Sequence, residues 1–416
     1  MKTPPLFVAF VLWAGSSSAC SPAAESPESV GSRDSSAVLS VGSHGARWRD
    51  GGAWSVSAVP KVTIGVLDGA PEYQFVGVTA AASQSDGDLV VVDGGGKTVR
   101  LFDGEGTFLR SLGGPGFGPG EFQNPGPVLI TEGDTILVWD KALFRLSRYD
   151  PDGGLVQTEV HDMGAIAKAV EPPLYPGEVD PLPDGGLLVR LVEKVMGPPS
   201  GLFRLRSGAL RVSPDLSRID TLMFFGDVEQ VAVDAPWGEF PVPAPLARRT
   251  WITHQGNPPR ICLGDQEGPE VFCFDPEGAR TTIRWTSEPR PVTRDEVQQW
   301  RTESVRSLGQ KLGEEDVLRM LEQVPVPQAR PPYSEIHLDP LGNLWVELGP
   351  SPGTNPESVD YLVFDPSGEE LGVVEIPPLR LLEIGEDFLI GLRHDEFEVE
   401  YLQVHEIRRE GESPGS

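Results

Sequence analysis

Two of the three cysteines have a spacing that suits a disulfide. Cys262 and Cys273 occur in two apolar runs, residues 260–263 and 271–275, which read as the two strands of one hairpin. Because the cysteines are symmetric about the intervening loop, we expect a cross-strand disulfide between them. The alternative is a pair of free, buried cysteines that pack as small apolar side chains. No partner histidine can be assigned that would make either cysteine a nucleophile.

The six histidines form no pattern that is typical of a metal site. Neither HxH nor HExxH occurs in the chain. His254 and His337 stand beside predicted strands, where each could face a central channel or form part of its wall. We expect the second role, that of a hydrogen-bonded wall residue, for both.

The acidic residues and the glycines do not indicate a metal, phosphate or catalytic site either. Most aspartates begin turns, where the side chain accepts hydrogen bonds from the nearby backbone. The Asp-Gly-Asp segment at 86–88 is too short for a calcium-binding loop. Gly96-Lys97-Thr98 has Val91 where a GxxxxGK[ST] phosphate loop needs its first glycine. GxSxG occurs at 349–353 and 411–415, but neither match leads into a helical pattern, as a nucleophile turn requires. The catalytic residues therefore remain unknown, and we predict no cofactor-binding residue and no metal ligand. The alternative is a single divalent ion in the central channel.

Composition excludes several classes of function. The chain of 416 residues carries a net charge of −28, which argues against binding to nucleic acid because phosphate contacts need a basic surface. The same acidic charge argues against electrostatic docking on anionic lipid. The 48 glycines and 41 prolines, together with an apolar fraction of 39%, predict a globular protein with many turns.

The N-terminus has the features of an export signal. Lys2 precedes an apolar run at 6–13 and then a series of small residues, so we expect a signal peptide at 1–19. The apolar run is shorter than the roughly 20 residues that span a bilayer. The segment before Cys20 resembles a bacterial lipobox, although Ser17 stands where that motif favours leucine. The resemblance implies lipidation of Cys20, and the alternative is ordinary cleavage before this residue.

Polar segments flank the body of the chain at both ends. Residues 21–45 are rich in serine, alanine, proline and glycine and have almost no apolar periodicity. Such a composition is typical of a flexible linker, and we place this tether at 20–60. At the other end, we expect a polar tail at 409–416.

The body of the chain consists of a repeated unit. One half of the unit is a turn that leads into an apolar run, as at 85–93, and the other half is an aromatic-Asp-x-x-Gly turn followed by an alternating run. Such turns occur at 102–106, 149–153, 274–278 and 364–368. They are typical of hairpins, so each unit predicts four short antiparallel strands. Several four-stranded units in succession are typical of a β-propeller.

Closure of this propeller is predicted from the two ends of the repeat region. We count five complete units and a final unit with only three strands, within 381–407. An unpartnered strand at 62–67 precedes the first unit. Pairing of this strand with the final unit would remove two exposed sheet edges at once. We therefore predict an all-β, six-bladed β-propeller at 61–408 that is closed by its N-terminal strand.

Residues 293–324 break the strand pattern and predict a helical insertion between blades four and five. Thr293 and Glu296 fit a capping box, and Gly313 separates two helices whose apolar residues fall mostly on one stripe. The insertion could be a lid over one mouth of the channel or a decoration that packs onto the propeller edge. We expect the second arrangement.

A glycine-rich segment at 113–122, followed by Asn124-Pro125, is similar to the linker that joins successive blades in NHL-type repeats. Together with the turns described above, it makes residues 60–408 resemble bacterial six-bladed β-propeller lipoproteins related to NHL-repeat and TolB-like propellers. The resemblance implies the fold and export. Related propellers are variously scaffolds, binders of peptides or polysaccharides, lactonases and lyases, so the fold does not select the function.

We therefore expect an exported protein of the cell envelope, either a membrane-anchored lipoprotein or a periplasmic or extracellular protein. Its expected role is a binding or scaffolding module for an envelope protein, a peptide or a glycan. The alternative is a metal-dependent hydrolase or lyase with its site in the central channel. We expect a monomer that contacts the membrane only through its lipid anchor and does not bind nucleic acid.

Overall fold

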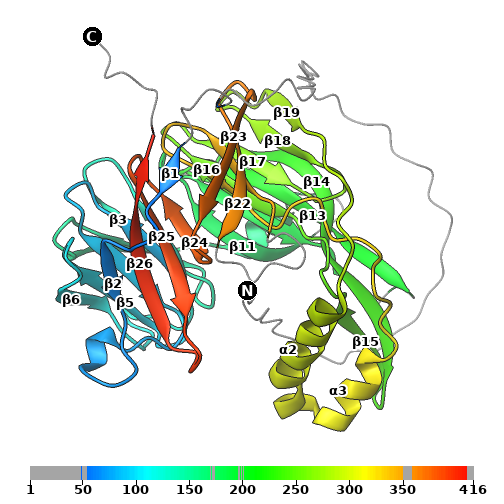
Figure 1. Ribbon diagram of the computed structural model, residues 1–416. Helices are drawn as coiled ribbons and strands as arrows, with labels where there is room; N and C mark the ends of the chain where they lie inside the picture. The colour runs from blue at the N-terminus through cyan, green and yellow to red at the C-terminus, as the bar shows by residue number, and fades with distance from the viewer. Residues whose placement is uncertain are drawn as a thin grey trace.

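The computed structural model describes residues 48, 54–168, 170, 174–194, 197, 199, 201–349 and 358–409. The strands in these residues form six antiparallel sheets, and helices are few (Figure 1). The expected all-β fold class is confirmed. The predicted signal peptide at 1–19, Cys20 and most of the predicted tether lie outside the described residues.

The first two sheets have four strands each, in chain order. The strands of the first are β3 (Val78–Ser83), β4 (Leu89–Asp93), β5 (Thr98–Phe102) and β6 (Phe108–Gly113). Those of the second are β7 (Pro125–Ile130), β8 (Ile136–Asp140), β9 (Arg145–Tyr149) and β10 (Leu155–Val160). Strands β4 and β8 are buried along their whole length. Their nearly continuous apolar sequences suit strands that are covered on both faces.

The next three sheets also follow the chain. The third consists of β11 (Tyr175–Pro181), β12 (Leu187–Val192), β13 (Leu202–Val212), β14 (Ile219–Ala235) and β15 (Gly238–Pro243). The fourth consists of β16 (Trp251–Gln255), β17 (Arg260–Gly264), β18 (Glu270–Phe274) and β19 (Arg280–Arg284). The fifth consists of β20 (Ile336–Leu338), β21 (Leu344–Glu347), β22 (Val359–Phe364) and β23 (Glu370–Ile376).

The sixth sheet joins the two ends of the described chain. It contains β24 (Arg380–Ile384), β25 (Phe388–His394) and β26 (Glu400–Arg408), and β26 also pairs with β1 (Ser55–Val56) and β2 (Val62–Ile64). The pairing of an N-terminal strand with the final unit is therefore present. Strand β2 ends before Gly65, at a φ of 139°, where a Cβ atom would collide with the carbonyl oxygen of Glu400. The chain turns away there, so the strand is shorter than the predicted 62–67.

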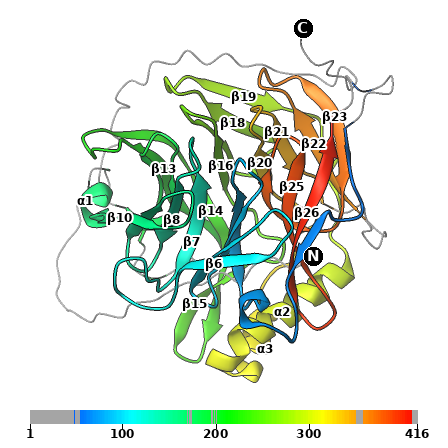
Figure 2. The same ribbon diagram turned by 90° about the vertical axis from the view of Figure 1, so that its left-hand side faces the viewer.

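Contacts between the sheets close a ring. The first strands β24, β3, β7 and β11 contact one another in this order, and β16 contacts β20. Apolar side chains complete the ring: Leu188 and Ile261 join the third sheet to the fourth, and Trp345 and Leu389 join the fifth to the sixth. The sheets thus surround a common axis in a β-propeller, which Figures 1 and 2 show from two sides.

The helical insertion lies between the fourth and fifth sheets, as predicted. Helix α2 (Arg294–Leu312) begins with a capping box between Thr293 and Glu296, and Gly313, at a φ of 89°, separates it from α3 (Glu314–Leu321). Two further short helices, α1 (Met163–Lys168) and the 3-10 helix η2 (Pro71–Tyr73), are not predicted by the sequence.

Part of the third sheet extends beyond the ring. The register aligns Tyr175, the first residue of β11, with Val192, Ser207 and Phe225. The following residues of β14, 226–235, therefore continue past the start of β11 by roughly 30 Å at about 3.3 Å per residue. We call the hairpin at 226–243 the arm. Figure 1 shows α2 and α3 beside it.

Two of the predicted boundaries are wrong. Residues 54–60 belong to the predicted tether, yet Ser55–Val56 form β1 and Trp54 is buried against Trp345. Arg409 belongs to the predicted polar tail, yet its guanidinium is buried beside Asp339. Both segments pack because their partners come from distant parts of the chain, which local composition does not reveal.

Among the described residues, no helix is long and apolar enough to cross a membrane.

Candidate functional site

The first strands of the six sheets begin at the same end of the ring, which we call the mouth. Hydrogen bonds between neighbouring sheets fix this alignment. At the start of β24, the Arg380 guanidinium donates to Val78 O at the start of β3, and Thr79 Oγ1 donates to Pro125 O at the start of β7. At the opposite end, Ser83 N donates to Glu383 Oε2 at 2.7 Å. Residues that precede first strands therefore converge at the mouth.

Charged residues from three sheets lie at the mouth. Arg249 stands two positions before β16, Glu335 stands directly before β20, and Arg380 is the first residue of β24. Both arginines interact electrostatically with Glu335. We call these three residues, together with Arg290 and Glu347, the mouth cluster. The chain separates them widely, but the ring brings them together.

Glu335 and Glu347 form a cross-strand pair of like charges. Glu347 N donates a hydrogen bond to Glu335 O at 2.8 Å, so the two residues lie opposite each other where β20 meets β21. Cβ atoms of residues in direct opposition are about 5 Å apart. Tyr361 Oη, from β22, donates to Glu347 Oε2 at 2.9 Å and so stabilises the ionised form of Glu347.

Burial favours protonation of this pair. Burial, together with the nearby charge of Glu347, raises the pKa of Glu335 to about 8, although Arg380 and Arg249 oppose the shift. Burial also raises the pKa of Glu347, against the effects of Tyr361 and Arg290. At pH 7, Glu335 is therefore mainly a neutral acid that can donate a hydrogen bond as well as accept one.

Both predicted wall histidines lie on first strands. His337 Nε2, from β20, is 3.7 Å from Glu335 Oε1, and burial lowers the pKa of His337 to about 4. His254, in β16, has a pKa lowered to about 4 by burial, against the opposing charge of Asp184. Their expected hydrogen bonding is incomplete, because His254 Nδ1 and His337 Nε2 are buried without a hydrogen-bond partner among the described residues.

The loops around Arg249 are held in place by Gln266. Its side-chain oxygen accepts from Arg249 N at 2.7 Å, and its side-chain nitrogen donates to Tyr333 O at 2.6 Å. One amide side chain thus ties the loop before β16 to the segment that leads into Glu335. The guanidinium of Arg249 lies 5.4 Å from the centre of the Trp251 ring.

The helical insertion is anchored at the mouth. Arg290, before α2, accepts a hydrogen bond at its carbonyl oxygen from Arg330 N, after α3, at 2.8 Å. Arg290 also interacts electrostatically with Glu347. Away from this anchor, Val317 and Leu321 of α3 pack against Val231 and Val242 of the arm. This packing is the arrangement that we expect for a decoration of the propeller.

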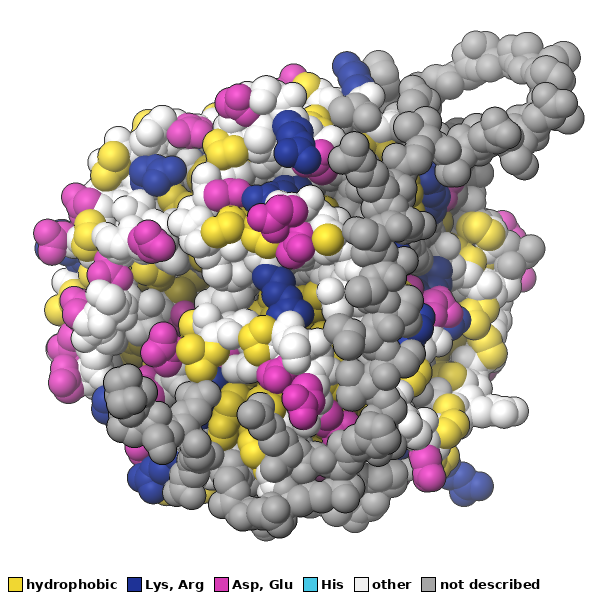
Figure 3. All heavy atoms as spheres, turned by 90° about the horizontal axis from the view of Figure 1, so that it is seen from above, with side chains coloured by type: hydrophobic (Ala, Val, Ile, Leu, Met, Phe, Trp, Pro, Cys, Tyr) yellow, Lys and Arg dark blue, Asp and Glu magenta, His cyan; other side chains and the backbone are white. Residues whose placement is uncertain are grey.

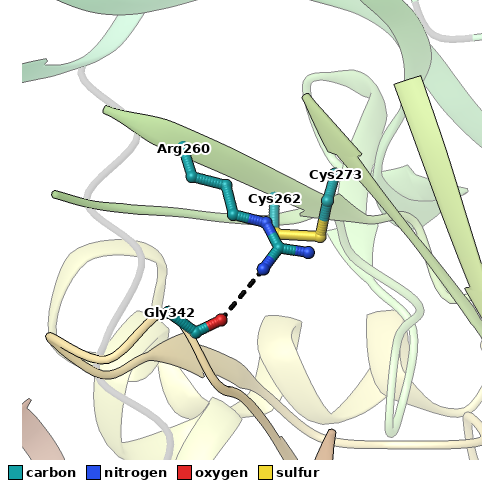
Figure 4. Close-up of a disulfide and its surroundings, with 4 residues drawn as sticks. All are labelled: Arg260, Cys262, Cys273 and Gly342. Atoms are coloured by element: carbon teal, nitrogen blue, oxygen red, sulfur yellow. Dashed lines mark hydrogen bonds between the residues drawn. A yellow bond between two sulfur atoms is a disulfide. The ribbon is translucent and has the colours of Figure 1, made fainter. Parts of the chain in front are cut away.

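The two strand cysteines belong to the framework of the fourth sheet. Cys262 in β17 and Cys273 in β18 are directly opposed and joined by a disulfide, and both are buried (Figure 4). Nearby, Arg260 Nη1 donates to Gly342 O at 2.9 Å and links the fourth sheet to the fifth. The disulfide thus lies where neighbouring sheets are fastened to each other.

Other features of the described residues mark no competing site. No group of three or more His, Cys, Asp or Glu side chains is arranged to hold a metal ion within the described ranges. The face seen in Figure 3 carries acidic and basic side chains that are interspersed with scattered hydrophobic ones. That face therefore has no uniform charge that would attract one class of ligand.

The sequence analysis places His337 beside a predicted strand, but it does not identify Glu335 or the rest of the mouth cluster. The available signal was weak: Arg249, Glu335 and Arg380 are charged residues placed at the beginning of runs that read as first strands. Each of them taken alone resembles an ordinary solvated strand end. Only the ring arrangement shows that these ends share one place.

No family model matches the chain, and no curated protein matches it. Solved structures resemble it at low similarity. A DUF4221 family member from Bacteroides vulgatus has a TM-score of 0.47 at 9% identity, covering 86% of this chain and 99% of that one. A candidate exported protein from Bacteroides fragilis has a TM-score of 0.46 at 12% identity, with coverages of 86% and 95%.

An inactive virginiamycin B lyase from Staphylococcus aureus, solved with quinupristin, has a TM-score of 0.41 at 10% identity, covering 84% of this chain and 99% of that one. Likeness at this level carries no conclusion about activity. The β-propeller assignment rests on the sheet order and the sheet contacts of the chain itself.

Proposed function

We propose that the protein is an exported, lipid-anchored, six-bladed β-propeller that binds a protein, peptide or glycan ligand at its mouth. Each of the six sheets counts as one blade, with β1 and β2 completing the last. In this proposal, residues 1–19 are the signal peptide, Cys20 carries the lipid, and the polar segment after it is the tether. The resemblance to NHL-related lipoproteins gives the same arrangement.

One observation carries the proposed binding role. Arg249, Glu335 and Arg380 come from three different sheets, yet their charges gather at the mouth. Charged side chains are costly to bury. Arg380 also links two sheets, but the side chains of Arg249 and Glu335 form no hydrogen bond with a described residue that would give them a role in the framework. Convergent polar groups on a rigid scaffold are typical of a ligand site.

The binding role is tested with labelled mature protein on a glycan array and a peptide array. Glu335→Lys places a long cationic side chain in the mouth and should abolish binding of any ligand class. Glu315→Lys is the matched charge change, at a position of α3 that is 89% exposed. Loss of an array signal in Glu335→Lys alone supports the proposal. No signal for the unaltered protein, or equal signals in both variants, contradicts it.

The anchor is tested separately by fractionation of cells. Cys20→Ser removes the only side chain that the lipid could modify at this site, so the protein should move from the membrane fraction to the soluble fraction. Persistence of the Cys20→Ser protein in the membrane fraction would overturn lipidation. The ligand array is unaffected by this outcome.

A further inference from the structure

Arg249 differs from its neighbours because its guanidinium forms no hydrogen bond or ion pair within the described ranges. Arg248 Nε donates to Glu229 Oε1 at 3.0 Å, and Thr250 Oγ1 donates to Gly226 O at 2.7 Å. The guanidinium of Arg249, in contrast, forms no hydrogen bond or ion pair with any described residue. It is partly buried, and burial lowers its pKa. A guanidinium has five N–H donors. No nitrogen of the Arg249 guanidinium is among the buried side-chain atoms without a hydrogen-bond partner, so these donors reach water and are open to a ligand.

The missing partner does not reflect a shortage of acceptors. The chain has 62 acidic side chains against 34 basic ones. Two carboxylates near Arg249, Glu178 and Asp227, are both already paired with Arg190. These two carboxylates form ion pairs with Arg190 and are therefore not available to Arg249. Arg249 therefore interacts with carboxyl groups through charge alone, most strongly with Glu335, and its guanidinium forms no hydrogen bond with a described residue.

The backbone of Arg249 is held rigidly beside Glu335. Gln266 ties Arg249 N to Tyr333 O, and its side-chain nitrogen also lies 3.3 Å from Ser334 O, directly before Glu335. The free donors of the arginine and the carboxyl groups of Glu335 and Glu347 therefore belong to one site. On one side of this site, the guanidinium of Arg249 can donate hydrogen bonds to a ligand. On the other side, the carboxyl oxygens of Glu335 and Glu347 can accept hydrogen bonds from ligand hydroxyl groups.

We propose that the guanidinium of Arg249 binds the carboxylate of an acidic sugar at the mouth, while Glu335 and Glu347 accept hydrogen bonds from the sugar hydroxyls. The inference rests on the proposed binding function and names its ligand. Arginine binds a carboxylate through two parallel hydrogen bonds. A phosphate dianion fits less well, because the charges of Glu347 and Glu178 repel it more strongly than they repel a single carboxylate.

The test is calorimetric titration of the mature protein with trigalacturonate, and with its fully methyl-esterified form as the neutral probe. The unaltered protein should bind the acid, and its affinity for the ester should be lower by a factor of about 30 or more. Arg249→Gln should lose a similar factor for the acid and little for the ester. Arg248→Gln is the matched control, since its side chain is already engaged by Glu229 and Glu267. It should keep the affinity within about twofold.

A second measurement separates a ligand role from a structural one. The guanidinium of Arg249 forms no hydrogen bond with a described residue, and the Glu335 carboxyl with which it interacts is protonated at pH 5. At pH 5, Arg249→Met therefore leaves no charge without a partner, and its melting temperature should equal or exceed that of the unaltered protein. A clear fall in melting temperature would show that the arginine supports the fold, and it would overturn the inference.

The outcomes distinguish this inference from the proposed function. Equal binding of the acid and the ester, or a peptide signal on the arrays that Arg249→Gln leaves unchanged, contradicts the acidic-sugar site and leaves binding at the mouth intact. The absence of any array ligand contradicts both. Loss of trigalacturonate binding in Arg249→Gln, with Arg248→Gln unaffected, supports both.

Discussion

Arg409 Nη1 donates a hydrogen bond to Asp339 Oδ2 at 2.8 Å and thereby joins the last sheet to the turn that follows β20. The same carboxylate accepts from Trp345 Nε1 at 3.0 Å. The guanidinium of Arg409 also lies 4.3 Å from the centre of the Trp54 ring. One arginine thus contacts the N-terminal segment, the fifth sheet and the sixth sheet, and it adds to the closure that β1 and β2 provide.

Removal of this arginine should destabilise the ring. The side chains of Arg409 and Asp339 are 8% and 0% exposed, so Arg409→Ala leaves a buried carboxylate without its counter-charge. We expect the free energy of unfolding to fall by about 3 kcal/mol, measured by urea denaturation. Arg408→Ala is the control, because that side chain is 67% exposed and should change stability by less than about 0.5 kcal/mol. Equal effects of the two substitutions would refute the role of Arg409.

The closing strand β2 offers a matched pair of adjacent side chains. Ile64 is 1% exposed and packs with residues of the first and sixth sheets, whereas Thr63 points outward. Ile64→Ala should lower the free energy of unfolding by about 2–4 kcal/mol, and Thr63→Ala should have little effect. Thermal unfolding followed by circular dichroism measures both. A small effect of Ile64→Ala would mean that β2 contributes little to closure.

The disulfide should contribute a modest part of the stability. Cys262 and Cys273 are 11 positions apart, and a loop of this length gives about 2–3 kcal/mol in the chain-entropy model. We expect urea denaturation to show this loss when reductant is added to the unaltered protein. Cys262→Ala combined with Cys273→Ala should be insensitive to reductant. If reductant changes neither the mass nor the denaturation midpoint of the unaltered protein, the cysteines are free.

The elements that were predicted correctly have local signals. Gly313 separates the two insertion helices because glycine adopts a positive φ without strain, and Thr293 and Glu296 need only each other to form a capping box. The Asp-Gly and Asp-Pro turns likewise identify most hairpins from a few adjacent residues. Such features depend on short stretches of chain, and a single sequence contains them.

The features that were missed depend on distant partners. Trp54 and Arg409 lie in polar surroundings in the sequence, and their burial comes from contacts with Trp345 and Asp339. The mouth cluster has the same character, since Arg249 and Glu335 meet only after the fourth and fifth sheets are side by side. A pattern of adjacent residues does not reveal contacts between distant parts of the chain.

The carboxyl of Glu335 should make stability depend on pH. Its pKa is about 8 in the folded protein, against about 4.3 for an unfolded chain, so the folded state binds a proton that the unfolded state releases between these values. Stability therefore falls as the pH rises from about 4.5 to about 8, because deprotonation leaves a charge in a buried site. Glu335→Gln keeps the shape of the side chain and removes this charge.

The variant should consequently be close to the unaltered protein at pH 5 and more stable at pH 9. Each unit of pKa shift corresponds to about 1.4 kcal/mol, and solvent screening of a side chain that is 25% exposed reduces the total, so we expect a gain of about 2 kcal/mol at pH 9. Urea denaturation at the two pH values measures it. Glu315→Gln, at a position 89% exposed, is the control and should differ from the unaltered protein by the same amount at both pH values. A Glu335→Gln protein with no gain at pH 9 would show that the carboxyl ionises there without cost and that the mouth is open to water.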